Sequence, residues 1–133
     1  SFAETGGPWA GRRGTLQRAE ALTDPQRTAL ATLYLALMCD ARLEELGALG
    51  PIIVDGPLAA DVLFLATLAA LRPASPVHAA GTRAGSLTGA LRLAGCSLPG
   101  DEPGPAATPL HAPELTAYRT RWLTDCETPA LQP

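Results

Sequence analysis

Apolar and polar residues follow two different periods along this chain, and these periods predict both strands and helices. Residues 51–54 and 76–79 are short apolar runs bounded by turn residues, which predicts two buried strands. Between them, residues 57–72 place leucines at helical spacing. Further helical patterns cover residues 23–46, 86–94 and 113–125. The expected fold is therefore α/β, with a parallel βαβ unit flanked by helices.

The pattern in residues 23–46 includes signals for both ends of a helix. Thr23 and Gln26 have the spacing of a capping box, in which each residue satisfies a free N–H of the other. Gly47 or Gly50 can take the left-handed conformation that ends a helix. The apolar stripe is expected to comprise Leu30, Leu33, Tyr34, Leu37, Met38 and Ala41. The solvated face is expected to carry Asp40, Arg42, Glu44 and Glu45.

Composition divides the chain into four parts. Residues 1–22 are rich in Gly and charge and predict a loop or extended segment, which begins as though cut from something longer. Residues 23–97 form the expected α/β core. Residues 98–112 are rich in Pro and Gly and predict an irregular connection over the surface. Residues 113–133 are expected to be a C-terminal helix and tail.

Size and charge narrow the classes of function. The chain has 133 residues, 47% of them hydrophobic, which fits one folded domain. Its net charge of −3 gives no general field for nucleic acid or an anionic membrane. The longest apolar run, residues 62–71, is too short to span a bilayer. Three widely spaced cysteines suit reduced thiols, so we expect a cytoplasmic domain.

Residues 54–61 carry the clearest functional pattern. Gly56 can adopt a positive φ without steric cost, and Pro57 suits the first position of a helix, where no N–H is needed. A strand that turns directly into a helix points free N–H groups outward, which makes a natural anion site. The alternative is an ordinary strand–helix turn. In that case Asp61 is only a first-turn carboxylate favoured by the helix dipole.

The other candidate residues are interpreted as structural. His78 and His111 are isolated, so neither is expected to bind a metal. Ser86 is interpreted as a helix N-cap, because no His or Lys base lies at a diagnostic spacing. Cys96 follows a helix end without an activating cluster. The sequence therefore predicts no catalytic residue and no metal ligand.

Two motifs, in this order, resemble the end of an FGGY-family carbohydrate kinase. Residues 54–61, Val-Asp-Gly-Pro-Leu-Ala-Ala-Asp, resemble the family's Val-Asp-Gly-Gly-type turn that ends in Asn. Residues 85–95 resemble the start of its Thr-Ala-Leu-Gly-Ala-Ala-type helix. The helices before and after these motifs also match the family's arrangement. The resemblance spans residues 11–127 and implies a ribonuclease-H-like fold of the actin-like ATPase type.

The resemblance also implies an activity. These kinases transfer the γ-phosphoryl group of ATP to a sugar hydroxyl between two domains, with Mg²⁺ bridging the phosphates. The chain resembles only the rear of the second domain, and the family's catalytic Asp lies upstream of it. We therefore expect no catalysis by this chain alone. The sugar and nucleotide would be engaged together with the missing N-terminal lobe.

The resemblance assigns four nucleotide-side positions to this chain. The turn at Gly56 and Pro57 corresponds to backbone beside the phosphates, and Asp61 to the Asn that contacts adenine. Gly89 corresponds to the glycine that lets its helix pack close to the nucleotide side. Two positions depart from the family. Pro57 lacks the N–H of a glycine, and Asp61 offers only acceptors where Asn offers a donor as well.

These departures keep a second class of function open. The same fold with a degraded nucleotide site would act as a non-catalytic regulatory or assembly module, which Pro57 and Asp61 favour. A different α/β nucleotide-binding domain is disfavoured, because Gly-x-Gly-x-x-Gly and Gly-Lys-Ser/Thr loops are missing from the sequence. Formation of a homodimer is another alternative, because the face against which the missing lobe would pack could drive self-association. No nucleic-acid or membrane partner is expected.

Overall fold

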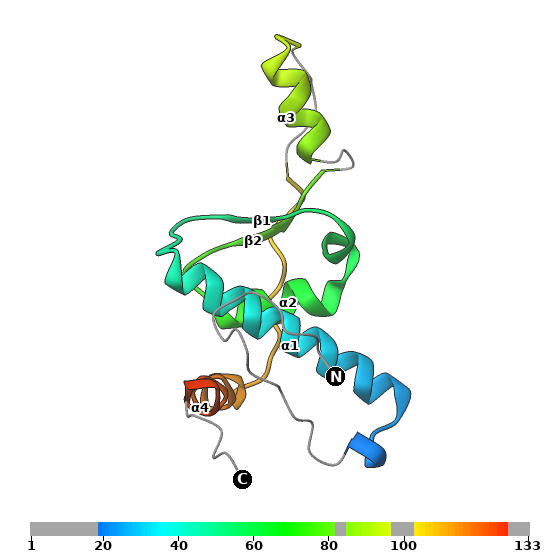
Figure 1. The fold of residues 1–133 in the computed structure, drawn as a ribbon, viewed down its shortest axis with the longest axis vertical. Helices are drawn as coiled ribbons and strands as arrows, with labels where there is room; N and C mark the ends of the chain where they lie inside the picture. The colour runs from blue at the N-terminus through cyan, green and yellow to red at the C-terminus, as the bar shows by residue number, and fades with distance from the viewer. Residues whose placement is uncertain (1–18, 82–84, 97–102, 128–133) are drawn as a thin grey trace.

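The computed structural model describes residues 19–81, 85–96 and 103–127, and Figure 1 shows how their elements are arranged. The elements in chain order are η1 (Ala19–Ala21), α1 (Asp24–Glu45), β1 (Ile52–Val54), η2 (Pro57–Ala60), α2 (Val62–Leu71), β2 (Val77–Ala79), α3 (Gly85–Leu93) and α4 (Leu115–Glu127). Most of the expected N-terminal segment 1–22 lies outside the described residues. No helix of the described part is long and apolar enough to cross a membrane.

The two short strands pair as the sequence predicts. β1 and β2 are parallel, with Ile52 opposite Val77 and Val54 opposite Ala79. The Ile52 N–H donates to the Pro76 carbonyl at 2.8 Å, just before β2 begins. Helix α2 supplies the crossover between the strands, which confirms the βαβ unit.

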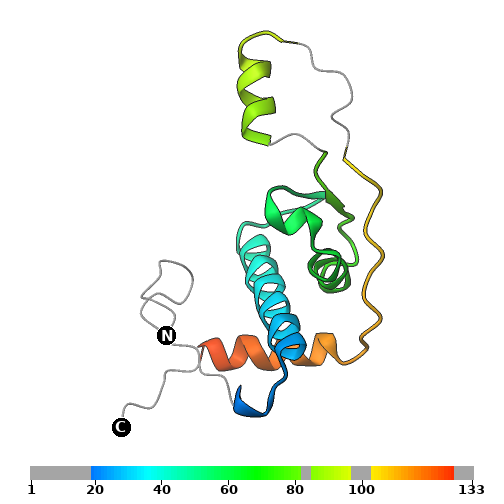
Figure 2. The same ribbon diagram turned by 90° about the vertical axis from the view of Figure 1, so that its right-hand side faces the viewer.

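The Pro-rich connection after α3 contacts the sheet more closely than predicted. The N–H of Ala107 donates to the Val77 carbonyl at 2.7 Å, and Ala106 forms an antiparallel bridge with His78. Further along, the Leu110 N–H donates to the Ala66 carbonyl of α2 at 2.9 Å. Figure 2 shows this yellow-to-orange segment passing from the level of β2 to α4. Residues 103–110 therefore bind along β2 and α2; residues 98–102 lie outside the described part.

The ends of α1 follow the predicted signals. The Thr23 N–H donates to the Gln26 side-chain oxygen at 2.9 Å, as in a capping box. At the other end, Gly47 has φ +60° and the Ala48 N–H donates to the Leu43 carbonyl at 2.9 Å. Glycine takes this left-handed conformation without steric cost, so the helix stops where predicted.

The hydrophobic core lies between α1, α2 and the sheet. Its fully buried apolar side chains are Ala36, Phe64, Leu68 and Val77. On α1, Leu37 is buried as predicted, but the buried line runs through Thr32, Ala36 and Asp40. The apolar stripe predicted for α1 therefore coincides only in part with the face of the helix that is buried. Tyr34, which was expected on the stripe, is 40% exposed.

The prediction that Asp40 lies on the solvated face of α1 is wrong. Its carboxylate is buried, and the Arg72 Nη1 donates to Oδ1 at 3.1 Å. The Arg119 Nε donates to Oδ2 at 2.5 Å. Burial of a carboxylate is unfavourable unless it is paired and hydrogen-bonded, and two guanidinium groups meet that condition here. Asp40 therefore joins α1 to the end of α2 and to α4.

The helix predicted over 57–72 is two helices. The 3₁₀ helix η2 ends at Ala60, Asp61 is extended with φ −87° and ψ 98°, and α2 begins at Val62. The Asp61 side chain accepts the Phe64 N–H at 3.0 Å, which caps α2. Asp competes for backbone N–H groups in this way, so it starts a helix more readily than it continues one.

Helix α4 closes the described chain across one end of α1. On this helix Leu115 is buried, and the Trp122 ring meets Tyr34 edge to face at 6.4 Å between centroids. With the Asp40–Arg119 pair, this ring contact fixes α4 to α1.

Candidate functional site

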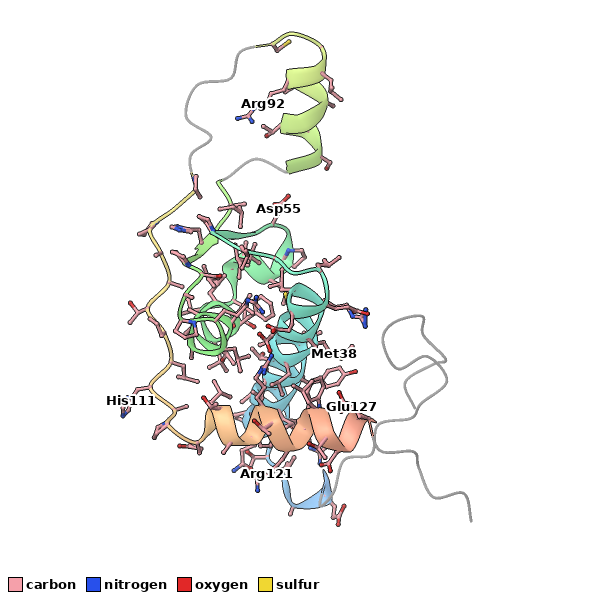
Figure 3. The ribbon with its side chains drawn as sticks, turned by 90° about the vertical axis from the view of Figure 1, so that its left-hand side faces the viewer. Met38, Asp55, Arg92, His111, Arg121 and Glu127 are labelled. Carbon is pink, nitrogen blue, oxygen red and sulfur yellow. The ribbon has the colours of Figure 1, made fainter. Side chains whose placement is uncertain are left out.

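Asp55 connects the turn after β1 to the start of α3. Its Oδ1 accepts the Gly56 N–H at 2.7 Å, and its Oδ2 accepts the Gly85 N–H at 2.7 Å. A carboxylate is favourable at a helix N-terminus, where the free N–H groups carry partial positive charge. Figure 3 shows Asp55 at the end of the core that faces α3, with Arg92 on that helix.

The close approach in this region occurs at Gly85. A Cβ on Gly85 would lie 2.6 Å from Asp55 Oδ2, so a larger residue would displace the carboxylate. A Cβ on Gly89, by contrast, would meet no protein atom within 4 Å. The predicted place of Gly89 on the nucleotide side stays a prediction. The sequence signal for Gly85 was only its place at the start of a helical pattern.

The turn itself has few free donors for an anion. Gly56 has φ +77°, as its predicted role in the turn requires. Its N–H, however, is donated to Asp55, and Pro57 has none. The Ala59 N–H donates to the Gly56 carbonyl at 3.0 Å. The anion site expected at this turn is therefore largely occupied by the protein's own acceptors.

Asp61 makes two hydrogen bonds within the protein. Besides capping α2 through Oδ1, it accepts the Thr32 hydroxyl at 3.3 Å through Oδ2. The carboxylate thus joins the start of α2 to α1. Its expected contact with adenine stays a prediction, and each oxygen keeps a further lone pair for a ligand donor.

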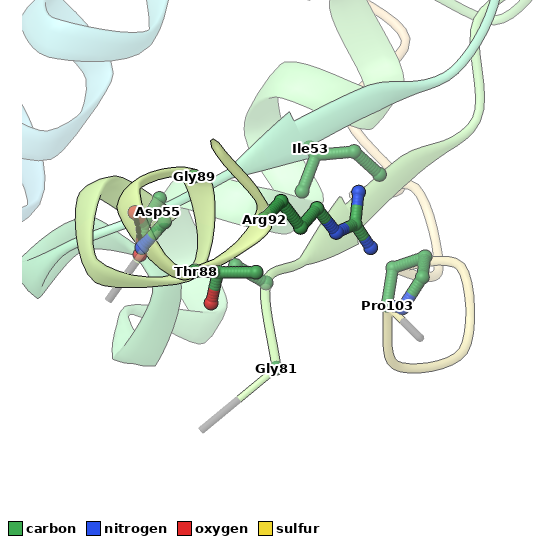
Figure 4. A pocket seen from close by; sticks show the side chains of 9 residues that line it. Ile53, Asp55, Gly81, Thr88, Gly89, Arg92 and Pro103 are labelled. Carbon is green, nitrogen blue, oxygen red and sulfur yellow. Dashed lines mark hydrogen bonds between the residues drawn. The ribbon is translucent and has the colours of Figure 1, made fainter. Parts of the chain in front are cut away.

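An open cleft lies between the turn and α3. Its volume is about 300 Å³, and Figure 4 shows it from close by. Its lining residues are Ile53, Asp55, Ala80, Gly81, Gly85, Thr88, Gly89, Arg92 and Pro103. Of the four predicted site residues, only Gly89 lines the cleft. Gly56 adjoins it through the hydrogen bond to Asp55.

Sequence reasoning missed two polar residues of this cleft, Thr88 and Arg92. Thr88 is 6% exposed, and within the described part of the chain its hydroxyl has no hydrogen-bond partner. Arg92 follows it by four residues, the spacing that places two side chains on one face of a helix. That spacing could have indicated the pair from the sequence.

The remaining candidates have structural roles or none. The His78 ring Nδ1 lies 2.8 Å from the Gly104 carbonyl, so it holds the connection after α3 against β2. Ser86 lies inside α3, which begins at Gly85, so the predicted N-cap role is wrong. Among the described residues, no group of three His, Cys, Asp or Glu could hold a metal ion.

Cys39 is a half-buried thiol beside the core. Burial raises its pKa above the ordinary value of 9.0, and the neighbouring Asp40 charge raises it further, while Arg72 lowers it. A raised pKa keeps the thiol protonated and unreactive.

A second cleft of about 250 Å³ lies where the C-terminal part of α1, the end of α2 and α4 meet, and it is lined by Asp40, Glu44, Arg72 and Arg119 among others. Its charges are already paired with one another. The Arg72 Nη1 donates to Asp40 and to Glu44 at 3.1 and 3.2 Å. The cleft therefore offers no unpaired charge among these four residues.

Comparison with known proteins relates this chain to one family of enzymes. Residues 1–103 match the sequence pattern of the family described as carbohydrate kinase FGGY, C-terminal domain. Among solved structures, the chain is similar to a carbohydrate kinase from Novosphingobium aromaticivorans, with 34% sequence identity and a TM-score of 0.63. The match covers 77% of this chain and 22% of that kinase, so the chain spans less than a quarter of its length. No curated protein sequence matches the chain.

Proposed function

Since the chain belongs to the FGGY carbohydrate kinase family, through its C-terminal domain, we propose that it forms the nucleotide side of an ATP-dependent sugar kinase. In such an enzyme the γ-phosphoryl group of ATP passes to a sugar hydroxyl. The chain would supply one wall of the cleft, and the remaining length of the protein the opposite wall. We propose that the protein is cytoplasmic. Its association into a homodimer stays a prediction.

One observation carries this proposal beyond family membership. The two motifs that resemble the family's nucleotide-side elements are adjacent in space, because Asp55 hydrogen-bonds both the turn at Gly56 and the first residue of α3. An open cleft lies between them. Ligands of α/β proteins bind outside the carboxyl ends of parallel strands, and this cleft lies just past the ends of β1 and β2.

The proposed fold of the complete domain is ribonuclease-H-like. β1 and β2 would be two strands of a larger sheet. Ile53 on β1 is 50% exposed, which supports the proposal that other parts of the complete domain cover this strand.

We propose that phosphoryl transfer depends on a general base from elsewhere in the protein. Three aspartates near the core already accept hydrogen bonds: Asp40 from two arginines, Asp55 from two backbone N–H groups and Asp61 from Phe64 and Thr32. A base must be within hydrogen-bond reach of the substrate hydroxyl and able to take its proton. These three are engaged in holding the fold.

Mg²⁺ is proposed to enter with the nucleotide. Mg²⁺ keeps several waters and binds through substrate phosphates plus one or two carboxylates, so it needs no complete protein cage. Asp55 is the carboxylate that lines the cleft. The ion would neutralise the phosphate charge there.

The rival proposal is a non-catalytic module with a degraded nucleotide site. Pro57 supports it, because its ring and missing N–H weaken a backbone contact to phosphate. The use of the Gly56 N–H by Asp55 supports it as well.

Isothermal titration of the 133-residue chain with ATP, ADP and adenosine, with and without Mg²⁺, tests the proposal. If the chain forms the nucleotide side of a kinase, it should bind ADP and ATP saturably, and Mg²⁺ should raise the affinity for ATP. Asp61→Asn restores the family's residue and should strengthen binding of all three adenine compounds. No binding at millimolar concentrations by either the parent chain or Asp61→Asn would favour the non-catalytic module.

A further inference from the structure

Three positions beside the proposed nucleotide cleft offer no N–H group to a phosphate. The Gly56 N–H is donated to Asp55, and Pro57 has no N–H. The Gly85 N–H at the start of α3 is also donated to Asp55. A phosphate group is bound by several N–H or O–H donors or by cationic side chains. Side-chain donors elsewhere in the cleft would therefore strengthen the binding of phosphate groups.

Thr88 has an unused hydroxyl in the wall of this cleft. The residue is 6% exposed and lines the cleft, and its Oγ1 has no hydrogen-bond partner among the residues that the structure describes. An unsatisfied buried hydroxyl is unfavourable, so native proteins rarely retain one without a function. A valine of the same shape would avoid that cost. The hydroxyl is thus available for a ligand.

Arg92 supplies a positive charge on the same face of α3. It lies one helical turn beyond Thr88 and also lines the cleft. Within the described residues its guanidinium has no ion-pair partner among the carboxylates. Figure 4 shows the Arg92 side chain extending along the cleft toward Ile53 and Pro103, with Thr88 between it and Asp55.

We propose that Arg92 and Thr88 bind the phosphate groups of the nucleotide, an inference that rests on the proposed function. The guanidinium would neutralise phosphate oxygens and donate to them in a fork, and the Thr88 hydroxyl would donate alongside. Asp55 stands at the other side of Thr88, where bound Mg²⁺ would offset its charge toward the phosphate groups.

Arg92→Gln and Thr88→Val test this assignment, with Arg121→Gln as a control for the loss of one charge. Arg121 lies on α4, at the opposite end of the molecule from α3, and its guanidinium lies 6.0 Å from the Tyr118 ring centroid. Titration calorimetry would give the affinities of each variant for ADP, adenosine and inorganic pyrophosphate. Amide-shift NMR would show whether residues 88–92 respond.

We expect Arg92→Gln to weaken ADP binding about tenfold, since hydrogen bonds to a charged group are the stronger kind. Thr88→Val should weaken it about fivefold, as for a neutral hydrogen bond. Because the Thr88 hydroxyl has no partner among the described residues, Thr88→Val should leave the melting temperature unchanged or raise it. Adenosine affinity should not change in either variant, and Arg121→Gln should bind ADP as the parent chain does.

The outcomes separate this inference from the function on which it rests. ADP affinity equal in the parent chain and Arg92→Gln would overturn the inference while leaving the nucleotide function standing. Pyrophosphate binding that is lost in Arg92→Gln, with adenosine not binding, would support a phosphate site and count against the adenine nucleotide. If neither ADP nor pyrophosphate shifts residues 88–92, the inference is wrong.

Discussion

Asp40 is a buried charge whose removal should be costly. It accepts hydrogen bonds from Arg72 and Arg119, whose side chains are 12% and 26% exposed. Asp40→Ala would leave two partly buried guanidinium groups without this partner. We expect a loss of about 3 kcal/mol in the free energy of unfolding, measured by urea denaturation.

The control for Asp40 is the exposed ion pair of Arg42 and Glu45 on the same helix. Glu45→Gln should cost at most about 0.5 kcal/mol, because exposed pairs are screened by solvent. Equal losses in the two variants would contradict the structural role of Asp40.

Cys39 should make the fold less stable at high pH. Its pKa is raised in the folded state, chiefly by burial, so the unfolded chain releases the proton first. The contribution of the protonated thiol is present below the unfolded pKa and is lost as pH rises above about 9.0. The free energy of unfolding should therefore fall more steeply with pH in the parent chain than in Cys39→Ala. Cys96→Ala, which changes an exposed thiol, should retain the parent slope.

At the scale of the element, Asp61 determines where α2 begins. Asp61→Ala removes the acceptor for the Phe64 N–H and for the Thr32 hydroxyl. We expect a loss of about 1–2 kcal/mol, as for other N-caps. Asp61→Asn keeps an acceptor oxygen and should stay within about 0.5 kcal/mol of the parent. A thermal melt of both variants checks this, and equal melting temperatures would show that the cap contributes nothing.

Two glycines of α3 should respond in opposite directions to the same change. Gly85→Ala places a Cβ 2.6 Å from Asp55 Oδ2, so the carboxylate must leave the helix N-terminus. Gly89→Ala meets nothing within 4 Å and should stabilise the helix by about 0.5–1 kcal/mol. Hydrogen exchange of the α3 amides should become faster in the first variant and slower in the second. The same direction in both would contradict the described contact.

The elements that could be predicted from the sequence depend on neighbouring residues. The capping box at Thr23, the glycine stop at Gly47 and the β-branched run of β1 are local signals, and the βαβ order follows from chain connectivity. Asp40 could not be predicted in this way, because its partner Arg119 is 79 residues away. The paired arginines make its burial favourable, and helical periodicity alone gives no sign of them.

The candidate site was predictable only as a region. The family motifs indicated the turn at Gly56 and the helix with Gly89, and the structure places the cleft there. They did not indicate that Asp55 and Asp61 use their oxygens within the protein, nor that Thr88 lacks a partner. These properties depend on how α3 and α1 pack against the turn.

At the scale of the whole molecule, the described part combines a small core with wide exposed apolar surface. Leu49, Val62 and Leu93 are 95%, 78% and 93% exposed. The chain spans 22% of the length of the carbohydrate kinase that it resembles. We propose that further parts of such a kinase would cover some of this surface and complete the nucleotide cleft.

We propose that this domain presents a nucleotide-binding wall between the β1 turn and α3. The most direct measurement is the map of backbone amide shifts in the 133-residue chain when Mg²⁺ and ADP are added. We expect the shifts to cluster at Gly56, Gly89 and Arg92 and to spare α4. Shifts clustered at the second cleft near Asp40 and Arg119, or none at millimolar ADP, would contradict it.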